Sequence, residues 1–177
     1  MPDLKSIPDD VKWRLAADCA ARLPAMYDVA FRKVLCDKFD DIEREIWIEL
    51  SKRAFTIARD LSLPMNNAHD LAESLHIVMT ILFGPEFRSE TLDVSEDGSV
   101  ILIKRCPLLS VAHETGALGE HTFPKCMALT LTTIPALKKD YSARFVRSMC
   151  HGDRQCEIKI SPEKKPDTTG SGKEKKR

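Results

Sequence analysis

The residues of this chain best suited to chemistry are its cysteines and histidines. Cys150 and Cys156 flank a His-Gly-Asp turn in the stretch RSMCHGDRQCEIKI. Cys106 directly precedes Pro107, which disfavours helix at Cys106 and is itself favoured in a first helical turn. A thiol at such a helix start is stabilised as the thiolate, the form that binds metal or attacks carbon. These positions indicate either a metal site or a nucleophile.

A fourth cysteine, Cys126, lies one turn into the next predicted helix. With Cys106, Cys150 and Cys156 it can converge at one end of a layer of helices on a sheet, as a tetrathiolate for zinc or for an iron-sulfur cluster. These four cysteines do not form the CxxC pairs typical of zinc sites. Spacing alone therefore also allows ordinary buried cysteines.

Three histidines near these cysteines offer a nitrogen ligand or a base for a cysteine nucleophile. His113 and His121 flank the turn between two predicted helices, and His151 directly follows Cys150. The plain alternative is a surface histidine, because loops are normally exposed. The enzyme hypothesis takes Cys106 or Cys126 as the catalytic cysteine and His121 or His151 as the base.

Composition limits the classes of protein to be considered. The chain has 177 residues, of which 43% are hydrophobic, and this length favours one domain with a tail. Basic and acidic residues number 27 each, and because residues 161–177 are net basic, the body is mildly acidic. No basic face for nucleic acid is therefore predicted. The sequence shows neither a secretory signal nor a membrane-spanning apolar run, so we expect a soluble, cytoplasmic protein with no membrane partner.

The predicted compartment also bears on how the cysteines are interpreted. Thiols stay reduced in the cytoplasm, so the 6 cysteines are expected to be ligands, nucleophiles or core residues rather than disulfides. Cys19 and Cys36 lie within predicted helices among Ala, Val and Leu. Because buried free cysteine behaves as a small hydrophobe, we expect both in the core.

The first half of the chain, residues 1–84, is predicted to be helical. One helix follows Asp9-Asp10 and is expected to break at Pro24, where a second begins. A third follows Asp40, which with Glu43 has the spacing of a capping pair, and its apolar residues recur every three or four positions. A fourth starts at an Asn cap and stops at Gly84.

The second half, residues 85–160, changes to strand periodicity. An Asp-Gly turn at residues 97–98 predicts one hairpin, and the His-Gly-Asp turn predicts another. Two helices lie between them, so the order is ββααββ and the fold class is α+β with an antiparallel sheet. The predicted strands cover 89–94, 99–105, 141–150 and 155–160, and the helices start at 107 and 122. Residues 161–177 are predicted to be a disordered basic tail, since they contain too little apolar surface to order themselves.

Three stretches of this half carry a family resemblance: KRCPLLSVAHETG, KCMAL and FVRSMCHGDRQCEIKI. A Cys-Pro opens a helix, a second Cys lies in the next helix, and a Gly-Asp-x-x-Cys turn leads into a strand. This order resembles the C-terminal half of the 4-vinyl reductase ligand-binding domains and of the L-2-amino-thiazoline-4-carboxylic acid hydrolase family. The resemblance covers roughly residues 85–160.

The vinyl-reductase resemblance implies a small-molecule sensor whose zinc is held by three cysteines and a glutamate. Cys126 and Cys156 match two of those ligand positions. Ser148 and Phe145 stand where the third cysteine and the glutamate are expected. Cys106 and Cys150 can replace the missing cysteine and glutamate, which would give a site of four thiolates.

The hydrolase resemblance implies ring opening of a thiazoline, in which water or a cysteine attacks the C=N carbon. Cys106, Cys126 and Cys156 match the recurring cysteines of that family. We favour a cysteine-rich, metal- and small-molecule-binding domain with a sensor or accessory role. A hydrolase of a cyclic C–N bond and a protein-interaction scaffold remain the alternatives, and a homodimer is compatible with each of them.

Overall fold

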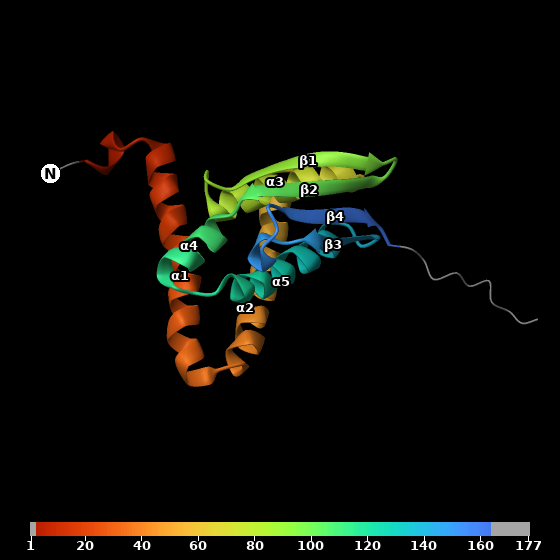
Figure 1. The fold of residues 1–177 in the computed structure, drawn as a ribbon. Helices are drawn as coiled ribbons and strands as arrows, with labels where there is room; N and C mark the ends of the chain where they lie inside the picture. The colour runs from red at the N-terminus through yellow and green to blue at the C-terminus, as the bar shows by residue number, and fades with distance from the viewer. Residues whose placement is uncertain (1–2, 164–177) are drawn as a thin grey trace, which may run out of the picture.

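A computed structural model describes residues 3–163 of the chain. Its N-terminal half is helical, and the first two long helices form a V beside a small sheet (Figure 1). Among the residues described, no helix is both long enough and apolar enough to cross a membrane. The elements of this half are η1 (Leu4–Ser6), α1 (Asp9–Leu35), α2 (Lys38–Asp60) and α3 (Ala68–Phe83).

Two details of the helical half differ from the sequence prediction. The predicted break at Pro24 is wrong, because α1 continues through it. The proline removes a single backbone hydrogen bond, while Ala21 and Ala25 on either side remain buried in the core. The predicted capping pair is also wrong, because α2 begins at Lys38, ahead of both Asp40 and Glu43.

The second half is an antiparallel sheet with two helices inserted between its hairpins, which confirms the predicted α+β class and ββααββ order. The four strands lie side by side in the order β1-β2-β4-β3, and each neighbouring pair is antiparallel. The elements are β1 (Arg88–Ser95), β2 (Gly98–Arg105), α4 (Pro107–Thr115), α5 (Gly119–Leu137), β3 (Tyr141–Arg147), η2 (Met149–His151) and β4 (Cys156–Pro162).

The main core lies between the sheet and helices α3 and α5. The central strands β2 and β4 pair with Ile101 opposite Ile158 and Ile103 opposite Cys156. These apolar side chains share one cluster of buried residues with the long helices, since Ala21 of α1 and Trp47 of α2 belong to it. The largest side chains that are fully buried in the sheet and its covering helices are Leu71, Leu75, Met79, Ile101, Leu129, Ile134, Ile158 and Ile160.

The connection between β3 and β4 is wound more tightly than the sequence predicted. The strand expected over 141–150 ends at Arg147, because side-chain hydrogen bonds turn the backbone there. The N–H of Ser148 donates to Asp153 at 2.9 Å, and the Ser148 hydroxyl accepts from the N–H of Cys150 at 3.2 Å. Gly152 follows with a φ of 92°, which glycine adopts readily.

The remaining boundaries differ by a few residues. The helix expected from 122 begins earlier, at Gly119, and Thr122 is buried inside it rather than capping it. Strand β4 continues to Pro162, into the range predicted as tail. Residues 164–177 of that predicted tail lie outside the described residues.

Candidate functional site

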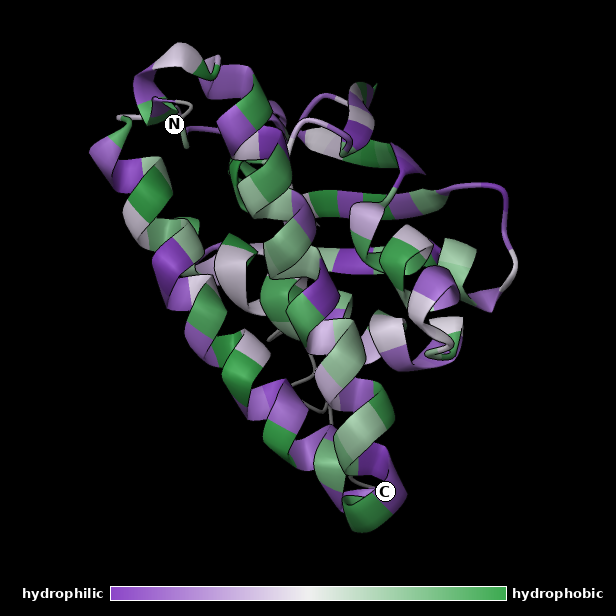
Figure 2. Cartoon of the chain, turned by 90° about the vertical axis from the view of Figure 1, so that its left-hand side faces the viewer, coloured by the Kyte–Doolittle hydropathy of each residue, from purple (hydrophilic) through white to green (hydrophobic). Residues whose placement is uncertain are grey.

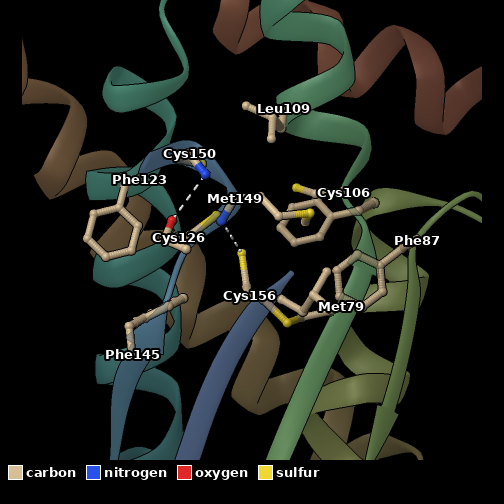
Figure 3. Close-up of a pocket in the computed structure, with 13 residues that line it drawn as sticks. Met79, Phe87, Cys106, Leu109, Phe123, Cys126, Phe145, Met149, Cys150 and Cys156 are labelled. Carbon is tan, nitrogen blue, oxygen red and sulfur yellow. Dashed lines mark hydrogen bonds between the residues drawn. The ribbon is translucent and has the colours of Figure 1, made fainter. Parts of the chain in front are cut away.

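A small cavity lies where α4, α5 and η2 meet the ends of the central strands (Figure 3). Its volume is about 10 Å³, which is enough for about one water molecule. Its walls are apolar except for thiols and one serine. The lining residues are Met79, Phe83, Phe87, Ile103, Cys106, Leu109, Phe123, Cys126, Phe145, Ser148, Met149, Cys150 and Cys156. We call this space the sulfur cavity.

The sulfur cavity is lined by Cys106, Cys126, Cys150 and Cys156, each from a different element. Cys106 is the N-cap of α4, with an extended backbone that Pro107 imposes on it. Cys126 comes from α5, and Cys150 lies in η2. Cys156 is the first residue of β4, and its sulfur accepts a hydrogen bond from the N–H of Met149 at 3.3 Å (Figure 3).

The four thiols differ in acidity. The Cys126 thiol donates a hydrogen bond to the sulfur of Cys106, and together with the N–H groups at the start of α4 this lowers the pKa of Cys106 to about 7. The same hydrogen bond, with burial, raises the pKa of Cys126. Burial raises the pKa of Cys150 to about 11 and also raises that of Cys156. One thiolate, at Cys106, is therefore favoured in this cavity.

The arrangement of these thiols does not match a metal centre. Within residues 3–163, no group of three or more His, Cys, Asp or Glu side chains is placed to hold a metal ion. The four cysteines surround the cavity with Cys126 and Cys106 joined by a hydrogen bond, whereas zinc needs four sulfurs within about 4 Å of each other. Zinc or an iron-sulfur cluster at these residues stays a prediction.

The predicted histidines lie outside the lining of the cavity. Of the described residues that line it, none is a histidine. His121 contacts the carboxylate of Asp28 at 3.3 Å, and His151 is exposed with its ring edge-on to Phe123. His113 is exposed near the end of α4. The roles of His121 and His151 as bases stay predictions, and neither ring reaches a cavity thiol in this arrangement.

The two cysteines that were expected in the core are on the surface, so that prediction is wrong. Cys19 and Cys36 are both exposed. Helix α1 turns its alanines toward the core at Ala17, Ala21 and Ala25, which places Cys19 on the outer face. Cys36 ends the helix with a φ of 49° at the exposed junction with α2.

A second polar site, which sequence reasoning missed, lies on the opposite side of α5. Arg32 donates to Asp28 at 2.7 Å, and the Lys125 ammonium lies 3.1 Å from Glu43 and 3.9 Å from Asp28. Asp28, Glu43 and Lys125 are buried, and burial raises the pKa of Glu43 against the opposing effect of Lys125. We call Asp28, Arg32, Glu43, His121 and Lys125 the charge cluster. The one feature of the sequence that could have indicated this cluster is Lys125, a charged residue among the apolar residues of α5.

Comparison with known proteins places the fold but not a family. No family model matches the chain, and no curated protein matches it in sequence. A trafficking protein particle complex subunit 3 from Naegleria fowleri, solved covalently bound to palmitic acid, has a TM-score of 0.57 and 13% identity. The match covers 82% of this chain and 96% of that one.

The second similar structure is the phenol-responsive sensory domain of the transcription activator PoxR, solved with phenol. Its TM-score is 0.56 with 13% identity, over 81% of this chain and 74% of that one. At this identity the likeness shows a shared fold. It agrees with the α+β class, whereas membership of either predicted family stays a prediction.

Proposed function

We propose that this chain is a small-molecule-binding domain with a sensor or accessory role, and that the sulfur cavity takes an apolar ligand. The observation that carries the proposal is the lining of this cavity, where aromatic, methionine and thiol groups surround a space that few polar atoms reach. Such apolar lining with a few convergent polar groups is typical of ligand sites. Support also comes from the two similar structures, which were solved with phenol and with palmitic acid.

The walls indicate which ligands fit. Phe123 and Phe145 meet edge to face at 5.1 Å between ring centroids, and they offer rings against which an aromatic ligand can pack. The thiols and Ser148 can exchange one or two hydrogen bonds with a hydroxyl group. A phenol-like molecule suits this set better than a charged one, because the walls are apolar and offer few groups that could solvate a charge.

The present volume requires the cavity to open before a ligand enters. Met79 and Met149 both line it, and methionine has flexible rotamers that refill space easily. Met149 and Cys150 are half-buried in the short segment η2, which we take as the entrance. Ligand binding then selects an opened form of this wall.

The test compares two tryptophan variants. Met149→Trp fills the entrance, and Val146→Trp places the same side chain on the exposed face of β3 as a matched control. Phenol and octanoate are titrated into each protein, with binding measured by calorimetry and by the shift in melting temperature. We expect phenol to bind the wild type and the Val146→Trp control but not Met149→Trp. Equal binding to all three, or no binding of either probe to the wild type, contradicts the proposal.

The thiolate at Cys106 favours the hydrolase alternative to a limited extent, because a pKa of about 7 makes it a competent nucleophile. Neither histidine predicted as its base lies in the cavity. Elemental analysis and an absorption spectrum of anaerobically purified protein test the separate prediction of zinc or iron-sulfur. A stoichiometric metal that is lost in both Cys106→Ser and Cys150→Ser would support the metal site. If the protein contains no metal and still binds phenol, the cavity is an apolar ligand site without a metal.

A further inference from the structure

An open groove lies inside the V of α1 and α2, and Phe83 lines both this groove and the sulfur cavity. The groove has a volume of about 1070 Å³. Its walls are Leu23, Tyr27 and Phe31 of α1 and Ile42 and Ile46 of α2. Figure 2 faces this side of the molecule and shows hydrophobic segments along both helices. We call it the helical groove.

The apolar face of α1 that lines the groove continues beyond it to Val34. Leu23, Tyr27, Phe31 and Val34 lie at helical spacing along the exposed face of α1. Val34 is 79% exposed and Ile46 59%, which is unusual for side chains of this kind gathered on one face. The charged residues Glu49 and Lys52 on the α2 wall pair with each other at 2.5 Å. A partner therefore does not need to supply a counter-charge for them.

The exposed area approaches what a stable protein interface needs. The large hydrophobic residues exposed in and beside the groove are Leu23, Met26, Tyr27, Phe31, Val34, Ile42 and Ile46. At roughly 100 Å² each, half of a large side chain, they present roughly 700 Å². A standard interface buries about 800 Å² on each partner. A small ligand in the groove would leave the outer side chains of α1, such as Met26 and Val34, exposed.

We propose that a second copy of this chain occupies the helical groove, so that the α1–α2 pairs of two copies pack around a twofold axis. The argument for a second copy is that one molecule carries both complementary shapes. Helix α1 presents the exposed apolar side chains of Met26 and Val34 as a ridge outside the groove, and the groove offers apolar walls of the width between two helices. Under twofold symmetry the ridge of each copy enters the groove of the other.

The test measures self-association by light scattering and by sedimentation over a wide range of concentration. Val34→Glu and Ile46→Glu each place a charge on the interface, and Val146→Glu is the matched control, because Val146 is comparably exposed on the sheet. We expect the wild type to be a dimer and each interface variant to raise the dissociation constant at least about 30-fold. The control should leave it unchanged. Circular dichroism verifies that each variant is folded.

A second measurement uses the wild type alone and does not depend on the folding of any variant. Its melting temperature should rise with protein concentration, because association stabilises the folded state by mass action. A monomer at every concentration overturns the proposal, including a monomer that carries a fatty ligand in the groove. A dimer that Val34→Glu and Ile46→Glu leave intact, or that Val146→Glu weakens equally, also overturns it.

Discussion

Lys125 and Cys126 are neighbours in sequence on α5, yet they reach two very different interiors. The thiol of Cys126 lines a cavity of apolar and sulfur groups, where its hydrogen bond goes to another cysteine. The ammonium of Lys125 enters a cluster of four other ionisable side chains from α1, α2 and α5. In the cavity, hydrogen bonds from Cys126 and from the first turn of α4 are enough to stabilise one thiolate, at Cys106, whereas the buried ammonium of Lys125 is paired with carboxylates. The cavity is thus free to accept a ligand, and the charge cluster is committed to structure.

The largest expected effect comes from breaking the charge cluster. Lys125→Met removes the cation beside Glu43 and Asp28 and leaves two buried carboxylates with fewer partners. We expect the free energy of unfolding to fall by about 3–5 kcal/mol, the usual cost of removing one partner of a buried pair. Urea denaturation measures this loss.

The control for that change removes both partners. The double variant Lys125→Met with Glu43→Met replaces the ion pair by apolar groups of similar size and should recover a large part of the loss. A single variant as stable as the wild type would mean that the pairing contributes little. A double variant that is less stable than the single one would contradict the assignment of Glu43 as the main partner.

A smaller effect is expected from enlarging the sulfur cavity. Met79 is 1% exposed in α3, and Met79→Ala should lower the free energy of unfolding by about 2–4 kcal/mol through lost contacts and added empty volume. Phenol should then restore part of this stability, because it fills the new space. Thermal melting with and without phenol measures the recovery.

This prediction also sharpens the contrast between the two interiors. Phenol should stabilise Met79→Ala more than the wild type and should not rescue Lys125→Met, where the defect is an unpaired charge. Equal stabilisation of both variants would show that phenol acts elsewhere on the protein.

The order of the helices and strands could be predicted from the sequence, because the strongest sequence signals act on the backbone of adjacent residues. The Asp97-Gly98 turn, the Cys106-Pro107 helix start and the stop at Gly84 each act through neighbouring backbone, and all three lie at element boundaries in the structure. The same signals predicted four cysteines near the ends of elements, and although Cys126 lies well inside α5, all four line one cavity.

The parts that were missed depend on contacts between distant elements. Asp28, Glu43 and Lys125 come from three helices, and each alone resembles an ordinary charge on a solvated face. Composition also could not show that Cys19 would face solvent, because alanines on the same helix occupy the core. Pro24 misled for a related reason, since packing on both sides of it maintains the helix.

The smallest expected effect concerns acidity within the sulfur cavity. Cys106 should titrate with a pKa of about 7, below the ordinary value of 9.0, and thiolate absorbance near the far ultraviolet reports it. Subtracting the thiolate absorbance of Cys106→Ser from that of the wild type gives the titration of Cys106 alone. Cys126→Ala should raise the pKa of Cys106 toward 9.0, because it removes the donated hydrogen bond. Cys19→Ala, at an exposed site, is the matched control and should leave that pKa unchanged.

The same titration has a consequence for stability. The pKa of Cys106 is lower in the folded chain than in the unfolded one, so its thiolate stabilises the fold. This contribution is complete above a pH of about 9 and is lost as the pH falls through about 7. Over that range the wild type should gain stability relative to Cys106→Ser as the pH rises, in urea denaturation at several pH values. A constant difference between the two proteins would mean that folding does not lower the pKa of Cys106, and a difference that shrinks as the pH rises would mean that folding raises it. Either result would remove the activated nucleophile of the hydrolase alternative.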